Sequence, residues 1–152
     1  GARVLAVSRS DRRLSLARDL GAEAVHSLTT GPGAEAARKF SGREGVDLVV
    51  ETAGTPEAVE EAMELARPGG RVVLTGLPHE PSRVHFFWVV RRELTLLGSM
   101  IYQDEFPEAM RLLKAGAVKV EPLVTHRFAL DAIQEAFAAH RSPESIKVAV
   151  IP

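Results

Sequence analysis

The feature that most constrains the fold is a repeated alternation of strand-length apolar runs with helical segments. The apolar runs are rich in β-branched residues and occupy residues 3–8, 24–27, 46–52, 71–75, 93–99, 123–128 and 146–151. Most lack polar–apolar alternation, as is typical of strands buried on both faces. Segments with helical patterns stand between them, at residues 10–20, 34–40, 55–66, 85–92, 105–115 and 130–140. This order predicts an α/β fold in which a parallel sheet carries helices on both faces.

Local signals mark where two of these helices begin. Ser10 or Asp11 is placed to cap the first helix, because short polar side chains accept the unpaired N–H groups of a first turn. Thr55 precedes Pro56, and proline at the first helical position loses no hydrogen bond. The stop of this second helix is predicted at Arg67–Gly70, directly before a strand.

Composition excludes several classes of protein. The 152 residues carry a formal net charge of −1, so no basic surface for nucleic acid or an anionic membrane is expected. The absence of cysteine excludes a disulfide scaffold, a cysteine nucleophile and a thiolate zinc site within this chain. The five histidines show no metal-ligand spacing, so we expect no metal site here. No apolar run is long enough to span a bilayer, and the default prediction is a cytoplasmic protein.

Five segments in the same order and spacing carry a resemblance to a known family. They are PGGRVVLTGLP at residues 68–78, ELTLLGS at 93–99, FPEAMRLL at 106–113, THRF with QEAF at 125–128 and 134–137, and SIKV at 145–148. Together they resemble the zinc-type medium-chain alcohol dehydrogenase/reductase family, nearest to its sorbitol- and threonine-dehydrogenase-like members. The resemblance implies the cofactor-binding, C-terminal part of an NAD(P)-dependent oxidoreductase. Such an enzyme transfers hydride between nicotinamide and a small alcohol or carbonyl substrate.

The resemblance also implies what should lie outside the chain. In the family a strand and its GxGxxG turn come immediately before a segment like Gly1–Val4, and no GxGxxG occurs in this sequence. We therefore expect a Rossmann-like sheet that lacks its first strand, which leaves a gap inside the sheet. Residues 1–116 are predicted to be a truncated dinucleotide-binding domain. Residues 117–152 would end that domain and return to a catalytic domain that holds zinc, so the chain alone should be inactive.

The end of the first strand offers the most informative candidate site. Dinucleotide folds that prefer NAD place a carboxylate there, whereas this chain has Ser8 followed by Arg9. Arg12 and Arg13 follow in the first helical turn, where cations oppose the helix dipole unless an anion lies nearby. This arrangement is similar to that of NADP-using members of the family and favours NADP over NAD. The alternative is that Arg12 and Arg13 form only a solvated helix face, and Asp11 offsets part of their charge.

The resemblance implies further cofactor contacts at later strand ends. The residues concerned are Ala53, Gly54, Thr75, Gly76, Ser99 and Ile101. Ala53 and Gly54 would flank the adenosine path, whereas Thr75 and Gly76 would approach the nicotinamide. Some members have arginine at the place of Ile101, so only its main chain can be carried over. Lys147 aligns with a basic residue that reaches the pyrophosphate, although it can also be an ordinary surface lysine.

Two other functions stay open at this point. One is a zinc-independent quinone or enoyl reductase of the same superfamily, and the other is a non-catalytic nucleotide-sensing module. Relatives commonly dimerise through the strand that corresponds to Glu93–Ser99, and its apolar run without proline or lysine suits a covered edge. We therefore expect a homodimer through this strand, and neither nucleic acid nor a membrane as a partner.

Overall fold

The computed structural model describes all 152 residues as an α/β protein with seven strands and six α-helices. The strands are β1 (Leu5–Ser8), β2 (Ala24–Ser27), β3 (Val46–Glu51), β4 (Ala66–Leu74), β5 (Thr95–Gly98), β6 (Val124–Ala129) and β7 (Lys147–Ile151). The α-helices are α1 (Asp11–Asp19), α2 (Gly33–Ser41), α3 (Pro56–Leu65), α4 (Phe86–Arg91), α5 (Phe106–Lys114) and α6 (Ile133–His140). Two short 3₁₀ turns, η1 (Glu121–Leu123) and η2 (Leu130–Ala132), flank β6. The predicted alternation is confirmed along the chain.

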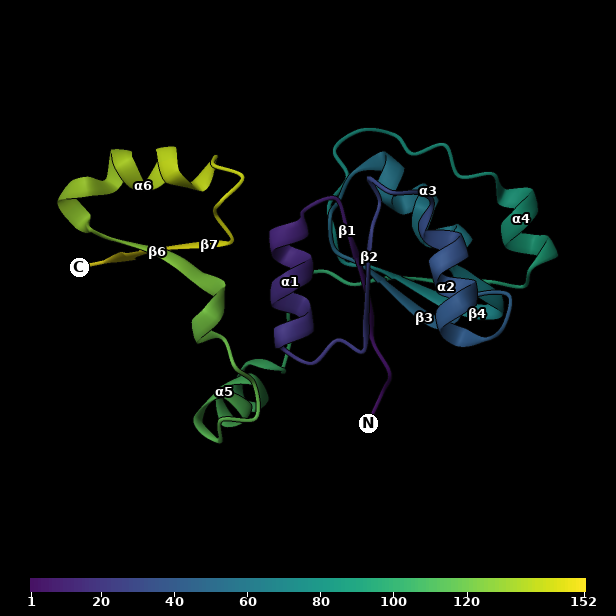
Figure 1. The fold of residues 1–152 in the computed structure, drawn as a ribbon, viewed down its shortest axis with the longest axis horizontal. Coiled ribbons are helices and arrows are strands. Elements are labelled where there is room, and N and C mark those ends of the chain that lie inside the picture. The colour runs from purple at the N-terminus through teal and green to yellow at the C-terminus, as the bar shows by residue number, and fades with distance from the viewer.

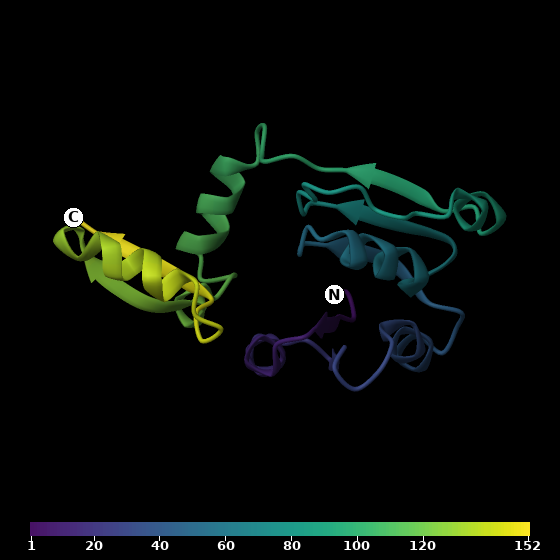
Figure 2. The ribbon, with the colours of Figure 1, turned by 90° about the horizontal axis from the view of Figure 1, so that it is seen from above.

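All strand pairs are parallel, as predicted, but they form three sheets. β1 pairs with β2, β3 pairs with β4 and β4 with β5, and β6 pairs with β7. The predicted gap falls between β1 and β3, where no strand lies, and β6 and β7 form a sheet of their own. Figure 2 shows this separation between the β1 ribbon and the stack of β3, β4 and β5. β1 is paired on one side alone, which agrees with the predicted gap.

The core lies where α3 packs on β3 and β4. The apolar residues of segment 55–66 have helical spacing, which predicts one buried stripe, and Val59, Ala62 and Met63 supply it in α3. They contact Val49 of β3 and Val72 of β4, and Val72 has no exposed surface. Burying such aliphatic side chains contributes roughly 1.5–3 kcal/mol each, so this layer holds β3 and β4 in position.

The caps of α1 and α3 form as the sequence predicts. Ser10 Oγ accepts the Arg13 N–H at 3.4 Å, and Thr55 Oγ1 accepts the Ala58 N–H at 3.2 Å. α3 ends at Leu65, directly before the predicted stop at Arg67–Gly70, but these residues already belong to β4, so the strand starts earlier than the predicted Arg71. A register shift between Val46 and Leu48 accommodates this early start of the strand.

The first two sheets are flanked by helices on two sides, whereas the last elements stand apart. Figures 1 and 2 both place α1 on one side of β1 and place α2 with α3 on the other. The unit made of β6, α6 and β7 lies beyond α1, at the far end of the molecule (Figure 1). None of the helices has the length and apolar character that crossing a membrane requires.

Several apolar side chains are more exposed than their spacing predicts. The helical spacing of residues 130–140 predicts that Leu130 and Phe137 face inward, but they are 61% and 58% exposed. Phe86 and Trp88 of α4 are also more than half exposed, so packing in the core is not their role.

Candidate functional site

Parallel pairing brings the carboxyl ends of β3, β4 and β5 to one edge. Glu51, Leu74 and Gly98 are in register across the three strands. The Ser99 N–H donates to the Leu74 carbonyl at 3.0 Å, so the chain after β5 starts beside the end of β4. Ligands of parallel α/β sheets bind outside such carboxyl ends, which makes this edge the candidate site.

Glu51 joins the loops that follow β3 and β4. Its buried Oε1 accepts the N–H groups of Ala53 at 2.6 Å and Gly54 at 2.8 Å. Its main-chain carbonyl accepts the Thr75 N–H at 2.9 Å, the Thr75 hydroxyl at 2.8 Å and the Gly76 N–H at 3.1 Å. The structure thus brings together Ala53, Gly54, Thr75 and Gly76, as the predicted site requires.

The glycines at these two positions are required by a close approach of main chains. A Cβ added to Gly76 would lie 2.3 Å from the Gly54 nitrogen and 2.6 Å from Glu51 Oε2. A Cβ added to Gly54, whose φ is +69°, would lie 2.7 Å from the Leu77 nitrogen. The loops after β3 and β4 therefore touch backbone to backbone, which goes beyond the ordinary turn chemistry of glycine.

Glu51 is the residue that sequence reasoning missed. It was seen only as part of an apolar strand, yet it is 5% exposed and its Oε2 has no hydrogen-bond partner. A carboxylate at the end of a buried strand is a signal that could have found it, because a buried charge needs partners. Those partners are main-chain N–H groups, which a sequence does not display.

The residues after β5 extend the same edge outward. Ile101 has a φ of +56° and a side chain that is 74% exposed. Positive φ is rare for a β-branched residue, and such strained conformations gather at functional sites. The strain lies in the main chain of Ile101, which is the part of this residue that the sequence predicts to contact the cofactor.

The end of β1 holds the second group of predicted residues. Ser8 Oγ accepts the Ser10 N–H at 3.1 Å, which leaves the Ser8 hydroxyl proton free to be donated elsewhere. Arg9 and Arg13 are exposed, and neither guanidinium makes a hydrogen bond or an ion pair. Arg12 differs, because its Nη1 lies 2.5 Å from Glu144 Oε2.

A charge effect places Arg9 near the start of α3. Hydrogen bonds of Glu57 with its own main chain and with Thr55, together with the Arg9 charge, hold the pKa of the Glu57 carboxyl below its ordinary value. The charge of Arg9 thus acts on the first turn of α3.

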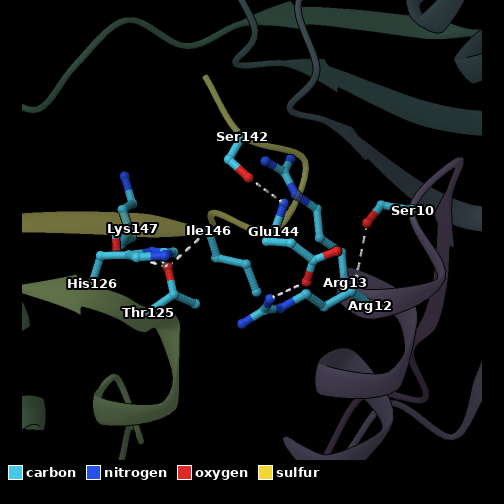
Figure 3. Close-up of polar contacts among 9 residues, drawn as sticks. All are labelled: Ser10, Arg12, Arg13, Thr125, His126, Ser142, Glu144, Ile146 and Lys147. Atoms are coloured by element: carbon cyan, nitrogen blue, oxygen red, sulfur yellow. Dashed lines mark hydrogen bonds and ion pairs between the residues drawn. The ribbon is translucent and has the colours of Figure 1, made fainter. Parts of the chain in front are cut away.

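Lys147 lies apart from the first group of site residues. It begins β7, and its side chain is exposed. Figure 3 shows Lys147 in the unit that Glu144 connects to α1 through Arg12. Lys147 therefore belongs to the same unit as Glu144, the partner of Arg12, and its main chain is tied to Thr125 of β6. No cluster of three metal-ligating side chains forms anywhere in the structure.

Comparisons with known proteins give consistent matches along this chain. The family model described as zinc-binding dehydrogenase matches residues 1–115. Human sorbitol dehydrogenase is 32% identical over 149 residues, which cover 97% of this chain and 42% of that protein. L-threonine 3-dehydrogenase of Bacillus velezensis is 32% identical over 153 residues, covering 99% of this chain and 44% of that protein.

Solved structures share the fold. A Sinorhizobium meliloti protein described as a zinc-binding dehydrogenase, solved bound to NADP, matches with a TM-score of 0.92 and 30% identity. The match covers 100% of this chain and 46% of that one. The chain thus spans less than half the length of the relatives it matches.

Proposed function

The chain belongs to the zinc-binding dehydrogenase family, and from this premise we propose that it is the cofactor-binding part of an NAD(P)-dependent oxidoreductase. The enzyme would transfer hydride between nicotinamide and a small alcohol or carbonyl substrate. The observation that carries the proposal is the junction at the carboxyl edge, where Glu51 holds the loops after β3 and β4 together. Ligands bind outside this edge in parallel α/β folds.

The donor groups around β1 fit the adenosine half of such a cofactor. Ser8 has a hydroxyl proton to donate, and Arg9 and Arg13 have guanidinium groups without partners. These groups suit a 2′-phosphate, since each charge-assisted hydrogen bond contributes roughly 1.5–3 kcal/mol. This supports a preference for NADP over NAD, in keeping with the NADP-bound relative.

The chain's own residues would position the cofactor and keep it oriented. Bound nicotinamide supplies hydride chemistry, while Ala53, Gly54, Thr75 and Gly76 offer it a rigid edge of main chain. The main chain of Ser99 and Ile101 would hold the carboxamide, and Lys147 would meet the pyrophosphate as a point charge. Zinc, which the family description names, would be bound by residues outside this chain.

The dimer and the cytoplasmic location stay predictions. β5 does form the edge of its sheet, which is the position that pairing through Glu93–Ser99 requires. Leu97 is 45% exposed on this strand and is available to a partner.

A binding experiment tests the proposed function and its cofactor preference together. Titration calorimetry with NADPH and NADH should show binding of both, with NADPH tighter. Arg9→Gln and Arg13→Gln should each weaken NADPH roughly tenfold or more and leave NADH nearly unchanged. Arg18→Gln is the matched control, because Arg18 lies in the last turn of the same helix and has no partner. Absence of binding to either nucleotide, or equal losses for both, would contradict the proposal.

A further inference from the structure

An ion pair connects the start of α1 with the far end of the chain. Arg12 and Glu144 are 132 positions apart, yet Nη1 and Oε2 lie 2.5 Å from each other. Figure 3 shows Arg12 reaching the turn that precedes β7. No other hydrogen bond or ion pair joins residues 121–152 to residues 1–116. Glu144 is therefore the single charged group of the last unit that forms an ion pair with α1.

The turn that carries Glu144 is fixed on both sides. The Glu144 N–H donates to Ser142 Oγ at 3.2 Å, and the Ser145 N–H donates to the Ser142 carbonyl at 3.0 Å. The Ile146 N–H donates to Thr125 Oγ1 at 3.1 Å, which ties the turn to β6. The carboxylate thus faces Arg12 from a main chain that its own hydrogen bonds hold in place.

The charge of this carboxylate bears on the region around Ser8. In dinucleotide folds a carboxylate at the end of the strand to which β1 is predicted to correspond repels a 2′-phosphate. This chain has Ser8 at that place, but Glu144 brings a carboxylate to the same helix start from another part of the sequence. It occupies Arg12 and so reduces the positive charge that an incoming phosphate would meet.

We infer that Glu144 is a specificity-determining residue that acts through Arg12. By holding this guanidinium it lowers the preference for adenosine that carries a 2′-phosphate over adenosine with a free 2′-hydroxyl. The inference rests on the proposed function, because it presumes that adenosine binds beside Ser8. It deepens that function by naming a residue, outside the usual strand-end position, that sets the balance between NADP and NAD.

The test compares two probes that differ at the 2′ position of the ribose. 2′,5′-ADP carries the phosphate and 5′-AMP lacks it, and calorimetry at low ionic strength measures both affinities with little screening. Glu144→Gln should lower the Kd for 2′,5′-ADP about two- to fivefold, which is the range of an exposed ion pair. The Kd for 5′-AMP should not change. Glu121→Gln is the matched control, because Glu121 pairs with Arg127 within the last unit.

A double variant tests whether Glu144 affects the binding of 2′,5′-ADP through Arg12 or through a general change of the protein. In the Arg12→Gln background, Glu144→Gln should no longer change the Kd for 2′,5′-ADP. Equal changes for both probes, no change, or an effect that persists without Arg12 would each overturn the inference. Failure of the proposed function looks different, since the wild-type chain would then bind neither NADPH nor NADH. A wild-type chain that binds neither probe counts against both.

Discussion

Replacing Glu51 should loosen the whole candidate edge, because one side chain holds two loops. Oε1 receives the N–H groups of Ala53 and Gly54 at 2.6 and 2.8 Å, and the residue is 5% exposed. Glu51→Ala removes both hydrogen bonds. Glu51→Gln keeps an oxygen acceptor at that place but loses the charge.

The magnitude follows from the number and kind of these bonds. A hydrogen bond to a charged acceptor contributes about 1.5–3 kcal/mol net, so two would contribute about 3–6 kcal/mol. The donors lie in loops that are part-exposed, and water recovers some of the loss. We therefore expect Glu51→Ala to lower the free energy of unfolding by about 2–4 kcal/mol, and Glu51→Gln by about half of that. For a chain of this size, the larger change corresponds to a drop in Tm of roughly 5–15 °C.

Urea unfolding followed by circular dichroism measures this free energy, with thermal melts as a second readout. Glu64→Ala is the control, because Glu64 is an exposed glutamate of α3 that makes no hydrogen bond or ion pair. A loss of stability in Glu51→Ala no larger than that in Glu64→Ala would refute the reasoning, as would a Glu51→Gln variant that is as unstable as Glu51→Ala. Either result would mean that the N–H groups of Ala53 and Gly54 do not depend on this carboxylate.

Three further predictions follow from single features. Gly76→Ala should prevent stable folding of the edge, because the added Cβ would lie 2.3 Å from the Gly54 nitrogen. Gly98→Ala is the control, since a Cβ there would meet open space and should be tolerated. Thermal melts of both variants measure the loss of stability. Leu97→Glu should convert a dimer to monomers in analytical ultracentrifugation, since Leu97 is 45% exposed on the edge strand, and an unchanged sedimentation coefficient would count against pairing through β5. The hydrogen bond from Arg3 holds the pKa of the Glu23 carboxyl below its ordinary value of 4.5. Because the pKa of Glu23 is lower in the folded than in the unfolded state, the stabilisation by this pair is complete above pH 4.5 and declines as the pH falls through the lowered pKa. Glu23→Gln should therefore flatten the acid limb of a plot of stability against pH.

Local signals in the sequence were sufficient for the elements but not for their assembly. Ser10 and Thr55 each cap a helix as their side-chain chemistry predicts, since capping involves only neighbours along the chain. The same patterns placed Leu130 and Phe137 inward, and both are exposed. Helical spacing shows which residues share a face, but it does not show whether another element of this chain covers that face.

In the candidate site, too, the sequence locates some residues and not others. Strand ends at Ser8, Thr75 and Ser99 could be located from apolar runs, because parallel strands end at a common edge. The role of Glu51 could not be found in this manner, since its partners are main-chain groups that look alike in every sequence. The contact between Gly54 and Gly76 depends on how two loops cross. Glycine is common in turns of every kind, so its presence in a loop does not by itself predict such a contact.

The arginines of α1 show how a distant contact resolves an ambiguity within one turn. Arg12 and Arg13 are equivalent candidates in the sequence, but adjacent residues of a helix point about 100° apart, as 3.6 residues per turn require. Only Arg12 pairs with Glu144, although Figure 3 shows the Arg13 side chain extending toward the same turn at Ser142. Arg13 thus keeps a guanidinium without a hydrogen-bond partner, while any contribution of Arg12 to phosphate binding requires separation from a carboxylate 132 residues away. The proposed cofactor preference would therefore depend on both ends of the chain, and the first turn of α1 alone would overstate the attraction for a 2′-phosphate.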